Sequence, residues 1–292
     1  MMLISNGWTE YELLDASDGE RLERWGRYIL IRPDPQSIWK SEKKAVQWKK
    51  ADGVYRREST GGGSWIKKDV PAEWELSYKD LKFSITPMGF KHTGLFPEQA
   101  VNWDWMRGLI RSRKDGGRQT KVLNLFGYTG GASVACAKEG AFVCHVDASK
   151  GMVAKAKQNA SLSGIPSDRI RYIVDDCFKF VMREIRRGSK YDAVILDPPS
   201  FGRGPGGEKW MIEEGLDSLM QNVALLLSDD PLFVLLNSYT TGLSPASCAY
   251  VLHNSVVTKF NGSIISEELG LPVTSTGIPL PCGASCRWTA DR

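Results

Sequence analysis

Apolar and polar positions alternate differently in two parts of the chain. From residue 120 onward, five nearly continuous apolar runs are each followed by a stretch of helical character. The runs are KVLNLFG, FVCHVDA, IRYIVDD, YDAVILD and LFVLLNS, and helices are expected at 131–139, 150–162, 177–187, 211–227 and 245–258. Apolar strands that alternate with helices are typical of a parallel sheet covered on both faces. Two further strands are expected near the C-terminus, in SIISEEL and ASCRWTA.

Residues 1–90 show short runs with period-two alternation, which favours β-hairpins. The expected strands include RYILIR, AVQWKK, GVYRRE, WELSYK and LKFSIT. The stretch 96–113, with Pro97 in its first turn, is predicted to be a helix. We therefore predict a small N-terminal β-rich domain over residues 1–95, with a possible role in substrate recognition, and an α/β domain over residues 96–292.

Composition narrows the class of protein only slightly. Apolar residues make up 42% and charged residues 25% of the chain, and no segment approaches the roughly 18 apolar residues of a membrane span. The N-terminus has no basic segment followed by a long apolar one, so it does not resemble a signal peptide. The six cysteines form no CxxC pair and no zinc-like cluster, and we interpret them as reduced thiols of a cytoplasmic protein.

Charge and aromatic content permit a nucleic-acid partner without requiring one. The net charge is +4, which is only mildly basic. Eight of the ten tryptophans precede residue 110, where they can fill the core of a small β module or, if exposed among lysines, stack on bases.

The ends of the apolar runs carry groups that suit one ligand, because ligands of an open α/β sheet bind beyond the carboxyl ends of its strands. The first run leads into NLFGYTGGAS, where glycines allow close approach and the next helix start favours an anion. The glycine spacing is not G-x-G-x-x-G, which disfavours an oxidoreductase. Asp147 ends the second run and can accept hydrogen bonds from ribose hydroxyls. Asp175 and Asp176 end the third run, where one acid can accept a hydrogen bond from the adenine amino group and the other can simply cap the next helix.

The fourth run ends in LDPPSF. Pro198 and Pro199 remove two amide donors, so Asp197 and the neighbouring carbonyls form a rigid row of acceptors. Such a row suits a planar substrate with an exocyclic amine, such as a nucleobase. Phe201 can stack on that base or anchor the loop, and GRGPGGEKW, residues 202–210, is either a flexible lid or a plain surface loop.

These motifs carry a resemblance to a known family. Residues 120–244 resemble a class I S-adenosylmethionine-dependent methyltransferase, with NLFGYTGG, VDAS, VDDCF and LDPPSF in that family's order. LKFSITPMGFKHTGLFPEQ, together with the glycine loop and LDPPSFGRG, more narrowly resembles the bacterial 23S rRNA cytosine-C5 methyltransferases. The resemblance covers roughly residues 75–290 and implies a Rossmann-like seven-stranded sheet whose last strand is antiparallel. The N-terminal PUA module usual in that family is not apparent.

The resemblance also assigns candidate roles, with S-adenosyl-L-methionine as cofactor. It implies that the glycine loop holds the methionine carboxylate, Asp147 the ribose, and Asp176 with the Cys177 amide the adenine. The cofactor-binding set is Thr93, Gln99, Asn124, Phe126, Gly127, Tyr128, Thr129, Gly130, Asp147, Ala148, Ser149, Asp176, Cys177 and Asp197. The candidate catalytic residues are Asp197, Pro198, Pro199 and Phe201.

The catalytic cysteine of the cytosine-C5 family is missing. Methylating cytosine C5 requires a thiolate that adds to C6. The resembling family supplies it after the fifth strand, where this chain has LLNSYTTGLS. The sequence therefore favours transfer to a nitrogen or another intrinsically nucleophilic atom. We expect RNA as the partner, ribosomal RNA by resemblance, with no membrane and no metal. A methyltransferase for a small molecule or protein, and a non-catalytic cofactor-binding protein, stay open as alternatives.

Overall fold

The computed structural model describes residues 2–58, 62–89, 91–113, 118–204 and 206–291. They form two compact units. The large unit consists of Met1–Met2, Asn102–Glu268 and Gly283–Arg292, and the small unit of Leu3–Val101 and Leu269–Cys282. The domain boundary expected after residue 95 stays a prediction; the two compact units change over after Val101, and the small unit also takes in a C-terminal segment.

One long sheet has the strand order β1-β16-β17-β15-β12-β9-β10-β11. Neighbours among β9, β10, β11, β12 and β15 are parallel, whereas β17 is antiparallel to β15. This arrangement confirms the Rossmann-like seven-stranded sheet with an antiparallel last strand, to which β1 adds an eighth strand. The strands are β1 (Met2–Ile4), β9 (Lys121–Leu125), β10 (Phe142–Asp147), β11 (Ile170–Val174), β12 (Ala193–Leu196), β15 (Phe233–Ser238), β16 (Gly262–Pro272) and β17 (Pro279–Ala290).

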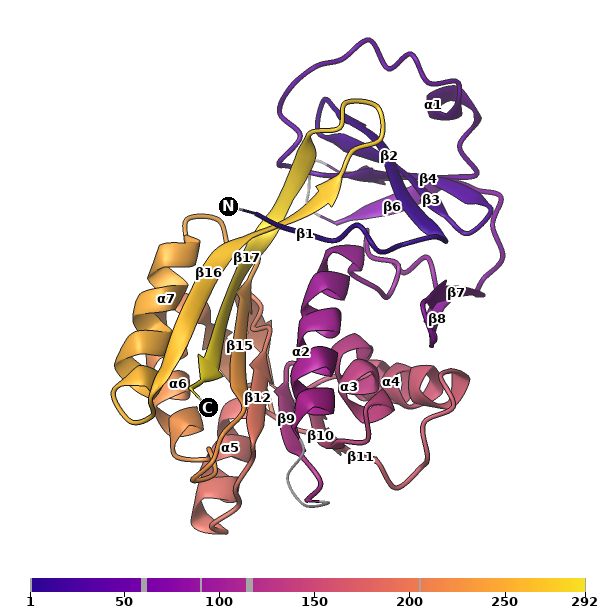
Figure 1. Cartoon of the computed structure of the whole chain (residues 1–292). Coiled ribbons are helices and arrows are strands. Elements are labelled where there is room, and N and C mark those ends of the chain that lie inside the picture. The colour runs from indigo at the N-terminus through magenta and orange to yellow at the C-terminus, as the bar shows by residue number, and fades with distance from the viewer. Residues whose placement is uncertain (1, 59–61, 90, 114–117, 205, 292) are drawn as a thin grey trace. The chain divides into compact units, whose positions relative to one another are not determined.

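Helices cover both faces of this sheet within the large unit. Figure 1 shows α2, α3 and α4 on one side and α5, α6 and α7 on the other. The apolar strand positions that face α5–α7, among them Leu125, Leu196 and Leu236, are fully buried in one continuous core with those helices. The helices are α2 (Ala100–Ser112), α3 (Gly131–Lys138), α4 (Lys150–Leu162), α5 (Cys177–Arg186), α6 (Ile212–Ala224) and α7 (Pro245–Leu252).

All five helices predicted after residue 120 are present with similar bounds. The helix expected at 96–113 forms as a short 3-10 turn, η1 (Pro97–Gln99), followed by α2. A π-helical turn, η2 (His253–Val257), extends α7. Among the described residues, no helix is both long enough and apolar enough to cross a bilayer.

The small unit contains a five-stranded sheet in the order β2-β3-β4-β5-β6 and a separate β7–β8 hairpin. Neighbouring strands are antiparallel except β4 and β5, which are parallel and therefore need a long connection. The strands are β2 (Tyr11–Ser17), β3 (Glu20–Trp25), β4 (Tyr28–Pro33), β5 (Gly53–Arg57), β6 (Gly63–Lys68), β7 (Trp74–Tyr78) and β8 (Leu81–Ile85). These strands confirm the predicted β-rich character of this part of the chain.

The strand predicted at AVQWKK was wrong, because this segment contains the short helix α1 (Gln47–Lys50). Ala45 and Trp48, three residues apart, both pack against a small core that includes Leu22 and Ile31. That spacing places side chains on one face of a helical turn rather than on one face of a strand. The α1 turn lies in the connection that lets β5 run parallel to β4.

Candidate functional site

The loop that joins β9 to α3 has an unusual backbone conformation. Phe126 (φ +55°), Tyr128 (φ +49°) and Gly130 (φ +83°) all lie in the left-handed region. Two non-glycine residues in this region within three positions are strained and must be held by their surroundings. Gly130 is also the N-cap of α3 and provides no side-chain acceptor, so the first amides of this helix face no capping side chain. Such amides suit an anionic group such as a carboxylate.

A buried chain of hydrogen bonds through Asn124, Ser133 and His145 lies next to this loop. Asn124 Nδ2 donates to Ser133 Oγ at 2.8 Å, and Ser133 Oγ lies 2.9 Å from His145 Nδ1. Burial lowers the pKa of His145 to about 4, so its imidazole is neutral at ordinary pH. A Cβ at Gly127 would lie 2.4 Å from His145 Cε1, so the loop packs on the imidazole only with glycine there. The side chain of Asn124, a predicted cofactor-binding residue, is thus committed to this buried chain.

Asp147 fixes the loop at the end of β10. Its Oδ2 accepts the Tyr128 amide and its Oδ1 accepts the Ser149 amide, both at 2.8 Å. Burial raises the pKa of the Asp147 carboxyl, and these two amides oppose that shift. Ser149 in turn caps α4 by accepting the Met152 amide, and Ala148 lies half-buried between the two. Each carboxylate oxygen keeps a further lone pair for a ligand donor.

The end of β11 reaches the same loop. The Phe126 amide donates to Cys177 Sγ at 3.3 Å, and burial raises the pKa of this thiol. Asp176 caps α5, because its Oδ1 accepts the Lys179 amide at 2.9 Å. The second oxygen of Asp176 approaches the segment after β12, since a Cβ at Gly204 would lie 3.0 Å from it.

The segment after the Asp-Pro-Pro turn contains two short paired strands. Strands β13 (Phe201–Arg203) and β14 (Lys209–Met211) pair antiparallel. The stretch 202–210, expected to be a flexible lid or a plain surface loop, thus contains paired strands, and its role as a lid stays a prediction; Pro205 lies outside the described residues. Phe201 is 53% exposed at the start of the hairpin, so its ring is accessible.

Trp210 links this hairpin to both the Asp-Pro-Pro turn and the glycine loop. Its Nε1 donates to the Pro199 carbonyl at 2.7 Å, and its ring centroid lies 5.3 Å from that of Phe126. A Cβ at Gly215 in α6 would lie only 2.7 Å from the indole. The hairpin residue Glu208 also pairs with Lys179 of α5. Our sequence reasoning missed Trp210; the available signal was a tryptophan in a glycine-rich loop followed by a glycine inside a helix.

The strand ends of the large unit thus converge through direct contacts. Phe126 contacts Cys177 and Trp210, Tyr128 contacts Asp147, and Trp210 contacts Pro199. This grouping brings together the predicted residues of four neighbouring strand ends: Asn124, Phe126, Gly127, Tyr128, Thr129, Gly130, Asp147, Ala148, Ser149, Asp176, Cys177, Asp197, Pro198, Pro199 and Phe201.

Thr93 and Gln99, the two remaining predicted residues, belong to the small unit. The Thr93 carbonyl accepts the Thr86 amide at 3.0 Å, and its buried hydroxyl has no hydrogen-bond partner among the described residues. Gln99 is the last residue of η1 and is 7% exposed. Their role at the methionine end of the cofactor stays a prediction.

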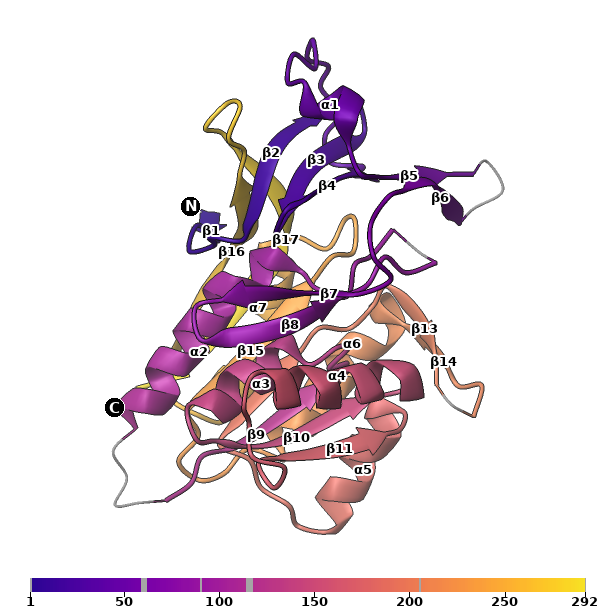
Figure 2. The same ribbon diagram turned by 90° about the vertical axis from the view of Figure 1, so that its right-hand side faces the viewer.

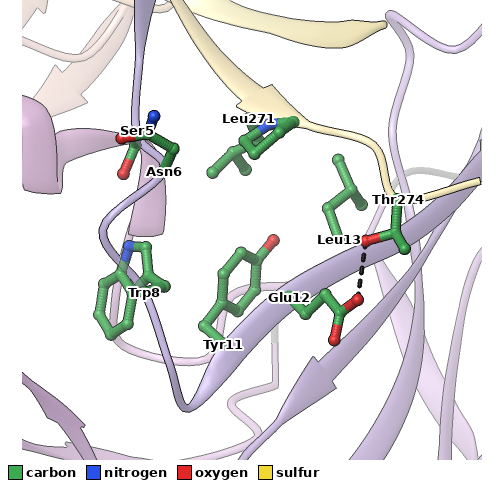
Figure 3. A pocket seen from close by; sticks show the side chains of 9 residues that line it. Ser5, Asn6, Trp8, Tyr11, Glu12, Leu13, Leu271 and Thr274 are labelled. Carbon is green, nitrogen blue, oxygen red and sulfur yellow. Dashed lines mark hydrogen bonds between the residues drawn. The ribbon is translucent and has the colours of Figure 1, made fainter. Parts of the chain in front are cut away.

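The small unit also has a pocket of about 110 Å³ between β2 and the C-terminal segment of that unit (Figure 3). Trp8, Tyr11 and Leu271 line it, and Thr274 Oγ1 donates to Glu12 Oε1 at 2.7 Å on its wall. None of its lining residues is a predicted site residue, and its volume is smaller than the several hundred Å³ typical of a cofactor site.

The donor set at the strand ends of the large unit fits S-adenosylmethionine: uncapped helix amides for a carboxylate, Asp147 for ribose hydroxyls, and Asp176 for an amine. A family model of S-adenosylmethionine-dependent methyltransferases matches residues 17–230. The chain belongs to this family. The S-adenosylmethionine-dependent methyltransferase from Agrobacterium tumefaciens has a similar structure, with 34% identity and a TM-score of 0.93 over 100% of this chain and 94% of its own. The chain is therefore a methyltransferase with S-adenosylmethionine as its cofactor.

Other similar proteins match this methyltransferase over a smaller share of their own length. The ribosomal RNA large subunit methyltransferase K/L of Shewanella baltica is 34% identical over 175 residues, 59% of this chain and 23% of that protein. The matched segments cover less than a third of the length of these curated relatives, from 19% to 30%. The Pyrococcus abyssi tRNA (uracil-54, C5)-methyltransferase, solved with S-adenosyl-L-homocysteine, shares the fold at 16% identity and a TM-score of 0.51, over 93% of this chain and 60% of its own.

Proposed function

We propose that this methyltransferase modifies a base of RNA, with large-subunit ribosomal RNA as its substrate, and that the methyl group goes to a nitrogen or another intrinsically nucleophilic atom. The observation that carries the proposal is the Asp-Pro-Pro turn at the end of β12, which Trp210 holds through the Pro199 carbonyl. The name of the Shewanella baltica relative supports RNA as the substrate class.

The cofactor supplies an electrophilic methyl group on a sulfonium. In this proposal the first amides of α3 and the loop 126–130 hold the methionine carboxylate. Asp147, already fixed by two amides, accepts the ribose hydroxyls, and Asp176 with the Cys177 amide contacts the adenine. Thr93 and Gln99 border the methionine end, as the family resemblance implies.

The acceptor base is positioned by the Asp-Pro-Pro turn. Pro198 and Pro199 have no N–H, so this turn offers the Asp197 carboxylate and backbone carbonyls as acceptors for an exocyclic amine. These bonds aim the base at the methyl group, and Phe201, 53% exposed, stacks on its face. The nitrogen–carbon bond forms as the carbon–sulfur bond breaks, and the nitrogen then loses its proton to Asp197 or water. Positioning supplies most of the catalysis in such an in-line transfer.

Thiolate chemistry at cytosine C5 is disfavoured by the surroundings of the cysteines. The residues at the end of β15 are Ser238 and Tyr239, neither of which forms a thiolate. Burial raises the pKa of Cys144 and Cys248 to about 11 and that of Cys286 to about 12. It also raises the pKa of the remaining three, Cys136, Cys177 and Cys282. At neutral pH these thiols are protonated and poorly nucleophilic.

The test is methyl transfer from labelled S-adenosylmethionine to total RNA from a strain that lacks this protein, followed by mass analysis of the nucleosides. The expected result is one nitrogen-methylated base, lost in D197A while S-adenosylhomocysteine affinity changes by no more than about threefold. Label in protein or in small metabolites would assign another substrate class. Cofactor binding without any transfer would contradict the proposal.

A further inference from the structure

The chain's positive charge is concentrated in one segment of the small unit. Residues 36–69 contain nine Lys or Arg and four Asp or Glu side chains, a net charge of +5. The whole chain has 38 cations and 34 anions, a net charge of +4, so the remainder has 29 and 30 and a net charge of −1. The mildly basic total therefore conceals one strongly basic segment.

Five cations of this segment form what we call the basic surface: Lys49, Lys50, Arg56, Arg57 and Lys68. All five residues are exposed, and none of their side chains forms an ion pair or hydrogen bond with another described residue. The other four cations of the segment each lie within 4 Å of a carboxylate, in the pairs Lys40–Asp18, Lys43–Glu20, Lys44–Glu42 and Lys67–Asp69. The uncompensated charge thus resides in the basic surface.

The basic surface follows α1 and the β5–β6 hairpin, with Arg56 and Arg57, as neighbours on β5, on opposite faces of that hairpin. Gly53 lies three positions after Lys50, the last residue of α1, and pairs with Lys68 across the hairpin, so Lys49, Lys50 and Lys68 lie at the same end. Arg57 ends β5, about 13 Å along the strand at the usual rise per residue. β6 is the edge strand of its sheet, and Figure 2 shows the hairpin extending outward from that sheet.

The same segment also carries an exposed aromatic ring. Trp39 is 42% exposed, and its Nε1 donates to the Ala16 carbonyl at 2.7 Å, which fixes the indole in place. Other tryptophans of the small unit fill its interior, and Trp25 is fully buried. Trp48 packs on the small core, and the Lys43 Nζ atom lies 4.3 Å from the centroid of its ring. The segment therefore presents cations and a fixed aromatic face together.

We propose that the basic surface docks the phosphate backbone of RNA. This inference rests on the proposed function, because it identifies where the RNA substrate is held outside the reaction centre. Unpaired cations spread along α1 and the hairpin match a chain of successive phosphates, whereas a small anion needs converging donors. Neutralised phosphates release counterions, which makes such binding strong at low salt and steeply salt-dependent. A fixed, exposed ring offers a stacking face for an unpaired base.

The test uses the full chain and a fluorescein-labelled, 24-nucleotide single-stranded RNA of mixed sequence, with binding followed by anisotropy from 50 to 300 mM KCl. The variant is K49Q/K50Q/K68Q. The matched control, K157Q/R186Q/K259Q, removes three exposed cations from the large unit. The basic-surface variant is expected to bind at least tenfold more weakly at 50 mM KCl. The slope of log K against the logarithm of the salt concentration is expected to become less negative by about 2. Each of the three lost phosphate contacts contributes roughly 0.7 to that slope. The control is expected to match the wild type.

Each other outcome has a distinct meaning. If the wild type binds and methylates RNA but the basic-surface variant binds as the control does, the docking inference is overturned and the proposed function stands. If the wild type binds no RNA, both fail. Binding of the wild type to phosphatidylserine vesicles but not to RNA would assign the basic surface to membrane binding and overturn the inference. Unchanged affinity for S-adenosylhomocysteine shows that the variant is folded.

Discussion

The indole Nε1 of Trp210 donates a hydrogen bond to the carbonyl oxygen of Pro199 at 2.7 Å. Pro199 belongs to the turn proposed to hold the acceptor base, while Trp210 belongs to the hairpin that follows and also contacts Phe126 of the glycine loop. A single side chain therefore ties the proposed acceptor turn to the cofactor loop. This relationship makes Trp210 a positioning residue, because it acts through Pro199 and Phe126.

Replacing Trp210 by Phe keeps a ring beside Phe126 and removes the N–H donor. The Pro199 carbonyl then loses its fixed orientation, and the loss of one hydrogen bond of this kind is worth about 1 kcal/mol. We expect kcat for RNA methylation to fall about fivefold while the Kd for S-adenosylhomocysteine changes by less than threefold. Steady-state kinetics and calorimetry measure the two quantities. An unchanged kcat would show that the bond does not position the acceptor.

Two helix glycines provide a matched pair for the packing of Trp210. Replacing a helix glycine by alanine usually stabilises a protein by about 0.5–1 kcal/mol. Gly108 in α2 has open space where a Cβ would lie, so G108A is expected to raise the melting temperature. At Gly215 the Cβ would lie 2.7 Å from the Trp210 ring, so G215A is expected to lower it, since overpacking costs about 1–3 kcal/mol. Thermal unfolding of both variants measures these two changes in melting temperature. If G215A raised the melting temperature as much as G108A does, the packing of Trp210 against Gly215 would be contradicted.

The absence of a reactive thiolate can be tested with RNA that contains 5-fluorocytidine. A thiolate-dependent enzyme adds to C6 and cannot release the fluorinated base, which leaves a covalent protein–RNA adduct. Because burial raises the pKa of all six cysteines, no adduct resistant to denaturing detergent is expected. Gel electrophoresis of the mixture after incubation with S-adenosylmethionine provides the readout. A shifted, label-bearing band would restore cytosine C5 as the target.

The buried position of Asp147 gives cofactor binding a defined pH dependence. Burial raises the folded-state pKa of this carboxyl above its usual range, and its ionised form is the one that accepts both ribose hydroxyls. Affinity for S-adenosylhomocysteine is therefore expected to fall as pH drops through that raised pKa, while D147N should show a flat profile. For an acid with a raised folded pKa, lowering the pH through it favours the folded state, so this group does not unfold the protein there. Titration calorimetry at several pH values checks the profile, and parallel profiles for both proteins would count against the assignment.

The large unit was predictable because its signals are local and repeated. Buried strands such as YDAVILD are continuous apolar runs, and α4 and α5, which follow two of these strands, begin at the caps Ser149 and Asp176. The carboxyl ends of parallel strands meet at one edge, so the residues after them were expected to converge. The contacts of Phe126 and Tyr128 with the next strand ends agree with that expectation.

The parts that escaped prediction depend on partners distant in the chain. AVQWKK alternates like a strand, but Trp48 donates to Asp15, 33 positions earlier, and packs on a core formed by other strands. The hairpin of Trp210 lies in a glycine-rich stretch whose local composition indicates only a loop; its order comes from contacts with Pro199 and Phe126. Likewise, the left-handed conformation of Tyr128 depends on Asp147, and no local pattern encodes it.

The account depends most on S-adenosylmethionine binding at the strand ends around Asp147. Titration calorimetry of S-adenosylhomocysteine into the wild type, D147A and D168A tests this directly. D168A removes an exposed carboxylate that precedes β11, at the opposite end of the parallel strands. Losing hydrogen bonds to a charged acceptor is worth about 1.5–3 kcal/mol, so D147A is expected to bind roughly 10- to 100-fold more weakly, with D168A unchanged. Equal affinity of D147A and the wild type would contradict the central claim.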